Sequence, residues 1–184
     1  MIKGSQPTDG GNLLLDVQEK EALLSENPSL ERWIRPVLGS QEFLNNGERY
    51  CLWFADATTK DLRDLMQIPA IKQRIENVKQ MRLSSTKAAT RKKADTPWLF
   101  DENRQPDQSY ILVPSVSSER RPYVPMGFLT KDTVSTNLNL IIPGANLYEF
   151  GVLTSQMHMD WMRTVAGRLE SRYRYSAQLV YNNF

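Results

Sequence analysis

Apolar residues recur at helical spacing in two stretches of the chain, residues 69–83 and 153–169. In the first stretch the intervals are four, three and five residues, and cations lie between the apolar positions. In the second the interval is always four, so the apolar side chains share one helix face. Both stretches therefore predict amphipathic helices. Their apolar positions are Ile71, Ile75, Val78 and Leu83, and Leu153, Met157, Trp161, Val165 and Leu169.

The chain before residue 69 predicts shorter elements. Residues 4–12 are rich in glycine and polar residues and predict a loop. Helices are predicted over 19–25, over 29–35 with Pro36 as its end, and over 60–66 with Thr58 or Thr59 as the cap. Residues 49–55 are rich in strand-forming side chains and predict a strand.

The pattern changes after residue 83. Residues 84–93 are small, polar and cationic, which is typical of a loop. Strand-like runs then follow at 97–100, 110–114, 123–129, 138–142 and 147–152, separated by turn signals. Helices come first, then strands, then a helix, without regular alternation. This order predicts an α+β fold with a mainly antiparallel β-sheet and flanking helices.

The composition is that of a globular protein, with 40% hydrophobic and 24% charged residues in 184. No apolar run approaches the roughly 18 residues of a membrane helix, and the N-terminus lacks the apolar core of a signal peptide. We therefore expect a cytoplasmic protein with no membrane partner. The single cysteine, Cys51, excludes an internal disulfide, and its apolar neighbours predict a buried, inert thiol.

The net charge of +2 conceals an uneven distribution. Residues 72–93 carry eight lysines and arginines and one glutamate, a balance of +7, whereas residues 1–66 have −4 and residues 94–184 have −1. A solvated helix face with a loop would explain this segment, and so would a polyanionic partner. Cations and hydroxyls of this kind contact the phosphates of nucleic acids.

Catalytic motifs are scarce. The chain has one histidine, His158, which borders an apolar stripe and is interpreted as structural; it has no glycine-rich nucleotide loop. No catalytic, cofactor-binding or metal-binding residue is therefore predicted. One alternative is a Mg²⁺-dependent nuclease that uses Asp107 and Glu119. However, Arg121 stands where such a site needs lysine, and arginine cannot adjust its pKa. A protein-interaction module is a second alternative.

The segment 117–123 mixes an acceptor, forked donors and an aromatic ring between two strand-like runs. Arginine can pair with guanine O6 and N7, and glutamate accepts from cytosine N4. If Glu119 and Arg121 lie on a strand, both side chains point to one side. The alternative is a surface ion pair between them. A second basic cluster, Arg163, Arg168, Arg172 and Arg174, is interpreted as a solvated helix face.

Several stretches together resemble one known family. They include KGSQPTDGGNL at 3–13, WIRPVLGS at 33–40, TPWLF at 96–100 and PSVSSERR at 114–121. Further matching stretches lie at 49–53, 82–85, 89–91, 123–127, 153–158, 167–169, 173–176 and 180–184. In this order they resemble the target-recognition domain of MmeI-like (type IIL) restriction-modification enzymes, which are adenine-N6 DNA methyltransferases.

The resemblance implies a domain organisation. Residues 1–18 are expected to be the linker from a preceding methyltransferase domain, and residues 19–184 the target-recognition domain, as a fragment of a larger bacterial enzyme that stops inside a motif. The fragment itself would be non-catalytic and hold no cofactor, whereas the parent would use S-adenosylmethionine, with Mg²⁺ for any nuclease. Its partners would be double-stranded DNA and the methyltransferase domain of the same polypeptide.

The resemblance and the charge pattern together name the candidate DNA contacts. The resemblance implies base contacts from the loop at Thr86, Lys87 and Ala88 and from Glu119, Arg121 and Tyr123. The charge pattern predicts phosphate contacts from six cations. These are Lys72, Lys79, Arg82, Arg91, Lys92 and Lys93.

Overall fold

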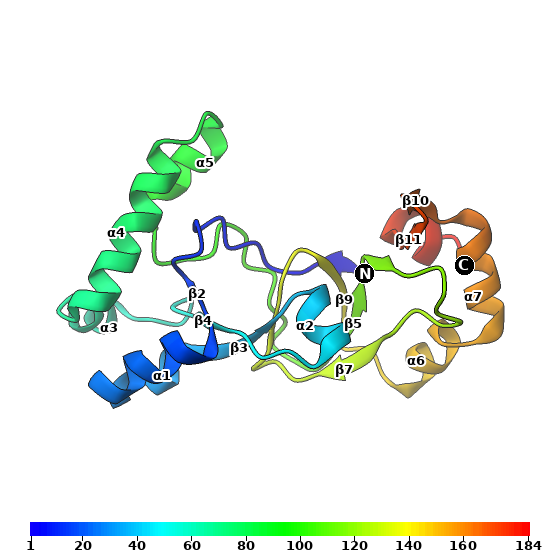
Figure 1. Cartoon of the computed structure of the whole chain (residues 1–184), viewed down its shortest axis with the longest axis horizontal. Coiled ribbons are helices and arrows are strands. Elements are labelled where there is room, and N and C mark those ends of the chain that lie inside the picture. The colour runs from blue at the N-terminus through cyan, green and yellow to red at the C-terminus, as the bar shows by residue number, and fades with distance from the viewer. The chain divides into compact units, whose positions relative to one another are not determined.

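A computed structural model describes all residues, 1–184, and its contacts divide the chain into two compact units. Unit 1 contains residues 1–4, 38–47 and 104–184, and unit 2 contains residues 5–37 and 48–103. Strand pairing within each unit is antiparallel, and helices accompany the strands (Figure 1). The predicted α+β class is therefore confirmed.

Unit 1 is built on a four-stranded sheet in the order β1-β9-β5-β7. Ile111 and Val113 of β5 pack with helix α7 residues on one face, while Tyr110 and Leu112 pack with Phe43 of helix α2 on the other. This follows from the two-residue period of a strand. The strands are β1 (Ile2–Lys3), β5 (Tyr110–Pro114), β6 (Val116–Ser117), β7 (Gly127–Leu129), β8 (Val134–Ser135), β9 (Asn139–Pro143), β10 (Gly167–Leu169) and β11 (Arg172–Arg174); the helices are α2 (Ser40–Asn45), α6 (Leu147–Leu153), α7 (Gln156–Val165) and the π-helix η3 (Ala177–Tyr181).

Unit 2 combines helices with a short sheet in which β4 pairs with both β2 and β3. Its core contains Cys51, which is fully buried, and Trp53, whose ring lies 5.1 Å from that of Phe100. Burial raises the pKa of Cys51 to about 12, so the predicted inert thiol is confirmed. The elements are β2 (Leu14–Leu15), α1 (Val17–Glu26), the 3₁₀ helix η1 (Pro28–Trp33), β3 (Ile34–Leu38), β4 (Tyr50–Leu52), α3 (Thr59–Leu65), α4 (Pro69–Leu83), α5 (Ala88–Lys92) and the 3₁₀ helix η2 (Lys93–Asp95).

Several sequence predictions are wrong. The helix predicted over 29–35 is a 3₁₀ turn that ends at Trp33, and Pro36 lies inside strand β3. Residues 147–152, predicted as a strand, form α6, because Asn146 and Glu149 make a capping box that starts a helix. Residues 97–100 form no strand, and residues 88–92, predicted as loop, form α5. The helix predicted over 153–169 is shorter, because Gly167 begins strand β10.

The first 18 residues belong to the folded units and are not a separate linker. Ile2–Lys3 pair with β9 in unit 1, and Leu14–Leu15 pair with β4 in unit 2. Gly4 lies against the backbone of Thr136, where an added Cβ would be 2.3 Å from the carbonyl oxygen, so only glycine fits there. No helix of the structure is both long enough and apolar enough to cross a membrane.

Candidate nucleic-acid interface

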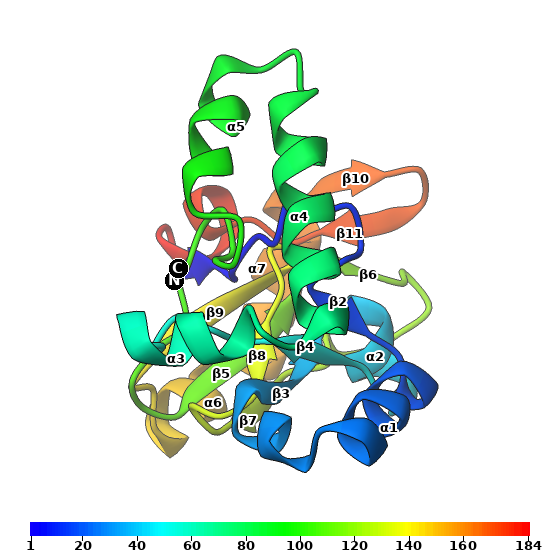
Figure 2. The same ribbon diagram turned by 90° about the vertical axis from the view of Figure 1, so that its left-hand side faces the viewer.

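The cationic segment of residues 72–93, hereafter the cationic arm, consists of most of α4, a short loop, the whole of α5 and the first residue of η2 (Figure 2). Four of its eight cations make hydrogen bonds or ion pairs within unit 2. Arg74, Arg82, Arg91 and Lys93 bind carbonyl or carboxylate oxygens of this unit. The four remaining lysines are exposed and have no ion-pair or hydrogen-bond partner for their ammonium groups. They are Lys72, Lys79, Lys87 and Lys92.

The position of Arg82 contradicts the prediction that this residue contacts phosphate. Its side chain is fully buried, and its guanidinium donates to five backbone carbonyl oxygens at 2.7–3.1 Å. Burial lowers the pKa of Arg82 from its ordinary value. An arginine has only five N–H donors, so none is left for a phosphate. The predicted phosphate contact by Arg82 is therefore wrong. The five acceptors belong to Pro7, Thr8, Lys93, Thr96 and Leu99.

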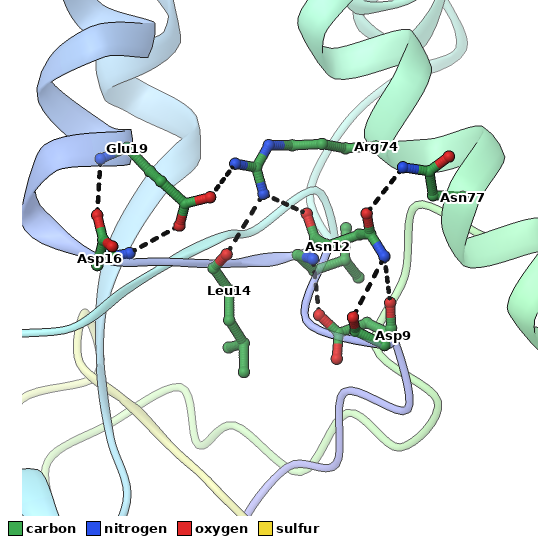
Figure 3. A network of polar contacts seen from close by, with 9 residues as sticks. Asp9, Asn12, Leu14, Asp16, Glu19, Arg74 and Asn77 are labelled. Carbon is green, nitrogen blue, oxygen red and sulfur yellow. Dashed lines mark hydrogen bonds and ion pairs between the residues drawn. The ribbon is translucent and has the colours of Figure 1, made fainter.

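Arg74 ties α4 to the N-terminal segment of unit 2 (Figure 3). Its guanidinium donates to the carbonyl oxygen of Asn12 at 3.1 Å and pairs with Glu19 at 2.5 Å. The neighbouring Asn77 donates to the side-chain oxygen of Asn12 at 3.0 Å. The base of the cationic arm is thus fixed by polar contacts as well as by its buried apolar stripe.

The loop of the arm carries three predicted base-contacting positions. Thr86, Lys87 and Ala88 are exposed, and Ala88 begins α5. The guanidinium of Arg91, one turn into α5, donates to the carbonyl oxygens of Ser85 and Thr86 at 2.8 and 2.9 Å. Arg91 therefore holds the loop, and its two bonds restrict what it can offer to a phosphate.

The other three predicted base-contacting residues lie in unit 1. Glu119 is a central residue of a turn in which the Arg121 N–H donates to the Ser118 carbonyl oxygen at 3.2 Å. The strand ends at Ser117, so the prediction that Glu119 and Arg121 share a strand face is wrong. We call residues 118–121 the reading turn, after the base contacts that the sequence analysis predicts for Glu119 and Arg121. Tyr123 follows it and is exposed.

The charges of the reading turn are arranged differently from the predicted ion pair. Glu119 lies 3.9 Å from the guanidinium of Arg120, and Arg121 has no side-chain partner. The pKa of Glu119 is lowered, foremost because its own backbone N–H stabilises the carboxylate, and further by the Ser171 hydroxyl and nearby arginines. Glu119 is therefore ionised at neutral pH and can accept hydrogen bonds, while the Arg121 donors are unused.

Helix α7 supports the chain that follows the reading turn. The Tyr123 hydroxyl donates to the side-chain oxygen of Gln156 at 3.2 Å, and the Val124 N–H donates to the sulfur of buried Met159 at 3.3 Å. Arg163 of α7 donates to the Pro122 carbonyl oxygen. Three residues on one side of α7 thus fix three consecutive residues beyond the turn.

The second basic cluster does not lie on one helix. Arg168 and Arg174 are on the β10–β11 hairpin, and Arg172 pairs with Glu170 at 2.7 Å. Only Arg163 is helical, so the prediction of a solvated helix face is wrong. Arg168 stacks on the ring of Tyr173 at 3.8 Å.

His158 is structural, as the sequence predicted. It is fully buried in α7, and its Nε2 lies 2.8 Å from the Tyr175 hydroxyl, with which it shares a hydrogen bond. Burial lowers the pKa of His158 and keeps it neutral at pH 7. No group of three or more histidine, cysteine, aspartate and glutamate side chains in the structure could hold a metal ion.

Comparison with known proteins decides the family. Residues 1–184 match the family described as "MmeI, target recognition domain". The chain belongs to this family.

Two relatives of the MmeI target-recognition domain family illustrate the match. DNA methyltransferase A of Bacillus subtilis (strain 168) is 43% identical over 181 residues, which are 98% of this chain and 20% of that protein. The solved structure of the type IIL restriction-modification enzyme MmeI in complex with DNA is 44% identical with a TM-score of 0.94 and covers the whole chain and 24% of its own. The chain thus spans about a fifth to a quarter of the length of these relatives.

The sequence did contain a signal for the buried arginine. Arg82 lies four residues after Val78 and continues the spacing of Ile71, Ile75 and Val78, whereas Leu83 breaks it with an interval of five. In the structure Arg82 is buried and Leu83 is exposed. Position along the helix, rather than residue type, decides which of the two side chains is buried, because a guanidinium group with hydrogen-bond partners can be buried.

Proposed function

We propose that this chain is the sequence-specific double-stranded DNA recognition module of a type II restriction-modification enzyme. The proposed parent polypeptide methylates adenine N6 with S-adenosylmethionine in its own methyltransferase domain, in the bacterial cytoplasm, and uses Mg²⁺ if it also carries a nuclease. This module holds no cofactor and performs no catalytic step. Its partners are duplex DNA and the methyltransferase domain of the same polypeptide.

One observation carries the proposal. The chain matches, along its whole length and with a TM-score of 0.94, a part of an enzyme whose solved structure is a complex with DNA. The surface supports this interpretation, because the cationic arm offers four unpaired lysines to a polyanion. Phosphate contacts hold a protein on DNA without sequence preference, so the choice of sequence needs further side chains at base edges.

We assign the base contacts to the arm loop at Thr86, Lys87 and Ala88 and to the reading turn with Tyr123. Glu119 supplies an ionised acceptor and Arg121 an unpaired fork of donors, which suits a cytosine and a guanine. The phosphate contacts are assigned to Lys72, Lys79 and Lys92. Arg91 and Lys93 assist through the donors that their contacts within the unit leave over.

A selection of DNA ligands tests the proposal. The purified chain would be mixed at low salt with duplexes that contain a randomised segment, and the bound duplexes sequenced. We expect an enriched motif, and we expect Glu119→Lys with Arg121→Asp to change one part of that motif while binding persists. Asp107→Ala, which removes an exposed carboxylate from the same unit, is the matched control and should leave the motif unchanged.

The same variants can be followed in the longer polypeptide. Mapping of methylated adenines in DNA from cells that express it should show the motif change seen in the selection. If the wild-type chain binds every duplex equally or none, the proposal is wrong. Plasmid cleavage by the purified chain that is lost in Asp107→Ala would favour the nuclease alternative.

A further inference from the structure

A hollow of about 280 Å³, lined by both polar and apolar side chains, lies next to the reading turn in unit 1. Ser118 and Arg121 line it from the turn, Val116 from strand β6 and Arg172 from strand β11. Helix α2 supplies the remaining wall. No acidic side chain lines the hollow. The α2 side chains involved are Ser40, Gln41, Leu44 and Asn45.

Two α2 side chains are free to contact a ligand there. Gln41 and Asn45 are exposed, one helical turn apart, and their amide groups make no hydrogen bond in the structure. They lie on the side of α2 opposite to Phe43, which packs on the sheet. Each amide can donate and accept at the same time, which neither Arg121 nor Arg172 can do.

Helix α2 is held firmly enough to position these amides. The Ser40 hydroxyl donates to the side-chain oxygen of buried Asn139 at 2.7 Å, and Asn139 donates to the Leu38 carbonyl oxygen at 3.0 Å. Phe43 lies over Gly127, where an added Cβ would be only 3.1 Å from the Phe43 ring. A fixed helix limits which base edges these two amides can reach, and this favours a selective contact.

We propose that Gln41 and Asn45 of α2 contact base edges next to the bases contacted by the reading turn, and are therefore specificity-determining residues. Glutamine and asparagine pair with adenine N6 and N7 through their two amide atoms. Because they share a hollow with Arg121, their base lies within a step or two of the Arg121 base. This inference rests on the proposed DNA-recognition function.

The test uses the duplex selection with Gln41→Ala and Asn45→Ala. We expect each variant to lose preference at one position beside the position changed by Glu119→Lys with Arg121→Asp, and to lose about five- to 150-fold in discrimination there. Gln178→Ala removes an exposed amide of the same unit outside the hollow and is the matched control. Asn45→Asp keeps the shape but replaces donors by acceptors, so the preference should move toward cytosine.

The outcomes separate this inference from the proposed function. If the wild-type chain selects no motif, the proposed function fails and the role of α2 fails with it. If the wild-type motif persists in all α2 variants, only the role of α2 is overturned. A uniform loss of affinity on all duplexes with a shallower salt dependence would mean that α2 contacts phosphate, and would also overturn it.

Discussion

Replacing Arg82 by methionine removes a buried guanidinium while keeping a long side chain. Five backbone carbonyl oxygens then lose donors that lie 2.7–3.1 Å away in the native structure. Three of them, the oxygens of Pro7, Lys93 and Thr96, keep a backbone N–H donor. The oxygens of Thr8 and Leu99 would be left unpaired, at about 1–3 kcal/mol each or about 2–6 kcal/mol together. The weaker pairing of the other three oxygens adds to this cost and water entry reduces it, so we expect a loss of about 3–5 kcal/mol in the free energy of unfolding.

Arg82→Lys should be intermediate. An ammonium has three donors, so at least two of the five carbonyl oxygens lose their bond to residue 82, and we expect a loss of about 2–4 kcal/mol. Lys79→Met, one turn earlier on α4 and exposed, is the matched control and should remain within about 0.5 kcal/mol of wild type. Different losses for these variants would show that the stabilising effect of Arg82 comes from its burial and its hydrogen bonds and not from its charge alone.

Urea unfolding, followed by the far-ultraviolet circular dichroism of the purified chain, measures these losses. Hydrogen exchange should show the fastest opening around the Arg82 acceptors, in residues 93–99 of unit 2. If Arg82→Met unfolds within about 0.5 kcal/mol of wild type, the five-carbonyl network does not stabilise the unit and the reasoning is refuted.

Three further predictions concern other parts of the chain. Lys92→Ala should weaken binding to all duplexes and reduce the salt-dependence slope by about one, as measured by fluorescence titration at several salt concentrations; an unchanged slope would remove Lys92 from the phosphate contacts. Because burial lowers the pKa of His158, the free energy of unfolding of wild type should fall as the pH drops below about 6.5, by at most about 1.4 kcal/mol per pH unit. In urea titrations at several pH values, His158→Gln should show a flatter pH dependence. An equal slope in both proteins would contradict this prediction. Arg163→Ala should speed hydrogen exchange in residues 123–124 and blur the selected motif while stability changes by less than about 1 kcal/mol, and unchanged exchange would exclude a positioning role.

The elements with a clear local signal could be predicted from the sequence. Pro69 and the apolar stripe after it predicted α4, and Thr58, one of the two predicted caps, caps α3 through Asp61. The prediction of a strand over residues 147–152 was wrong, because the capping box from Asn146 outweighed the strand-forming side chains. This is a short-range interaction that composition does not record. The sequence analysis missed strand β3 because it took Pro36 as a helix end, whereas proline can also occupy a strand position where no N–H is required.

The candidate site shows the same division. Residue type and charge singled out segment 117–123 and the lysines of the arm as candidates, and the structure shows that Glu119 and these lysines are accessible. They could not separate Lys79 from Arg82, three positions apart on one helix, because one faces solvent and the other faces carbonyl oxygens contributed by Pro7 and Leu99. Nor could they identify Gln41, whose interest arises from a hollow formed by segments about 75 to 130 residues away in sequence.

The path of the backbone through the two units limits how this protein can be re-engineered. The chain passes from one unit to the other four times, at residues 4–5, 37–38, 47–48 and 103–104. Neither unit is a continuous peptide, so neither can be transplanted as a cassette with two junctions. Exchange of specificity between relatives is therefore best made by replacing the whole chain or, on the assignment proposed above, by point changes in the arm loop, the reading turn and α2.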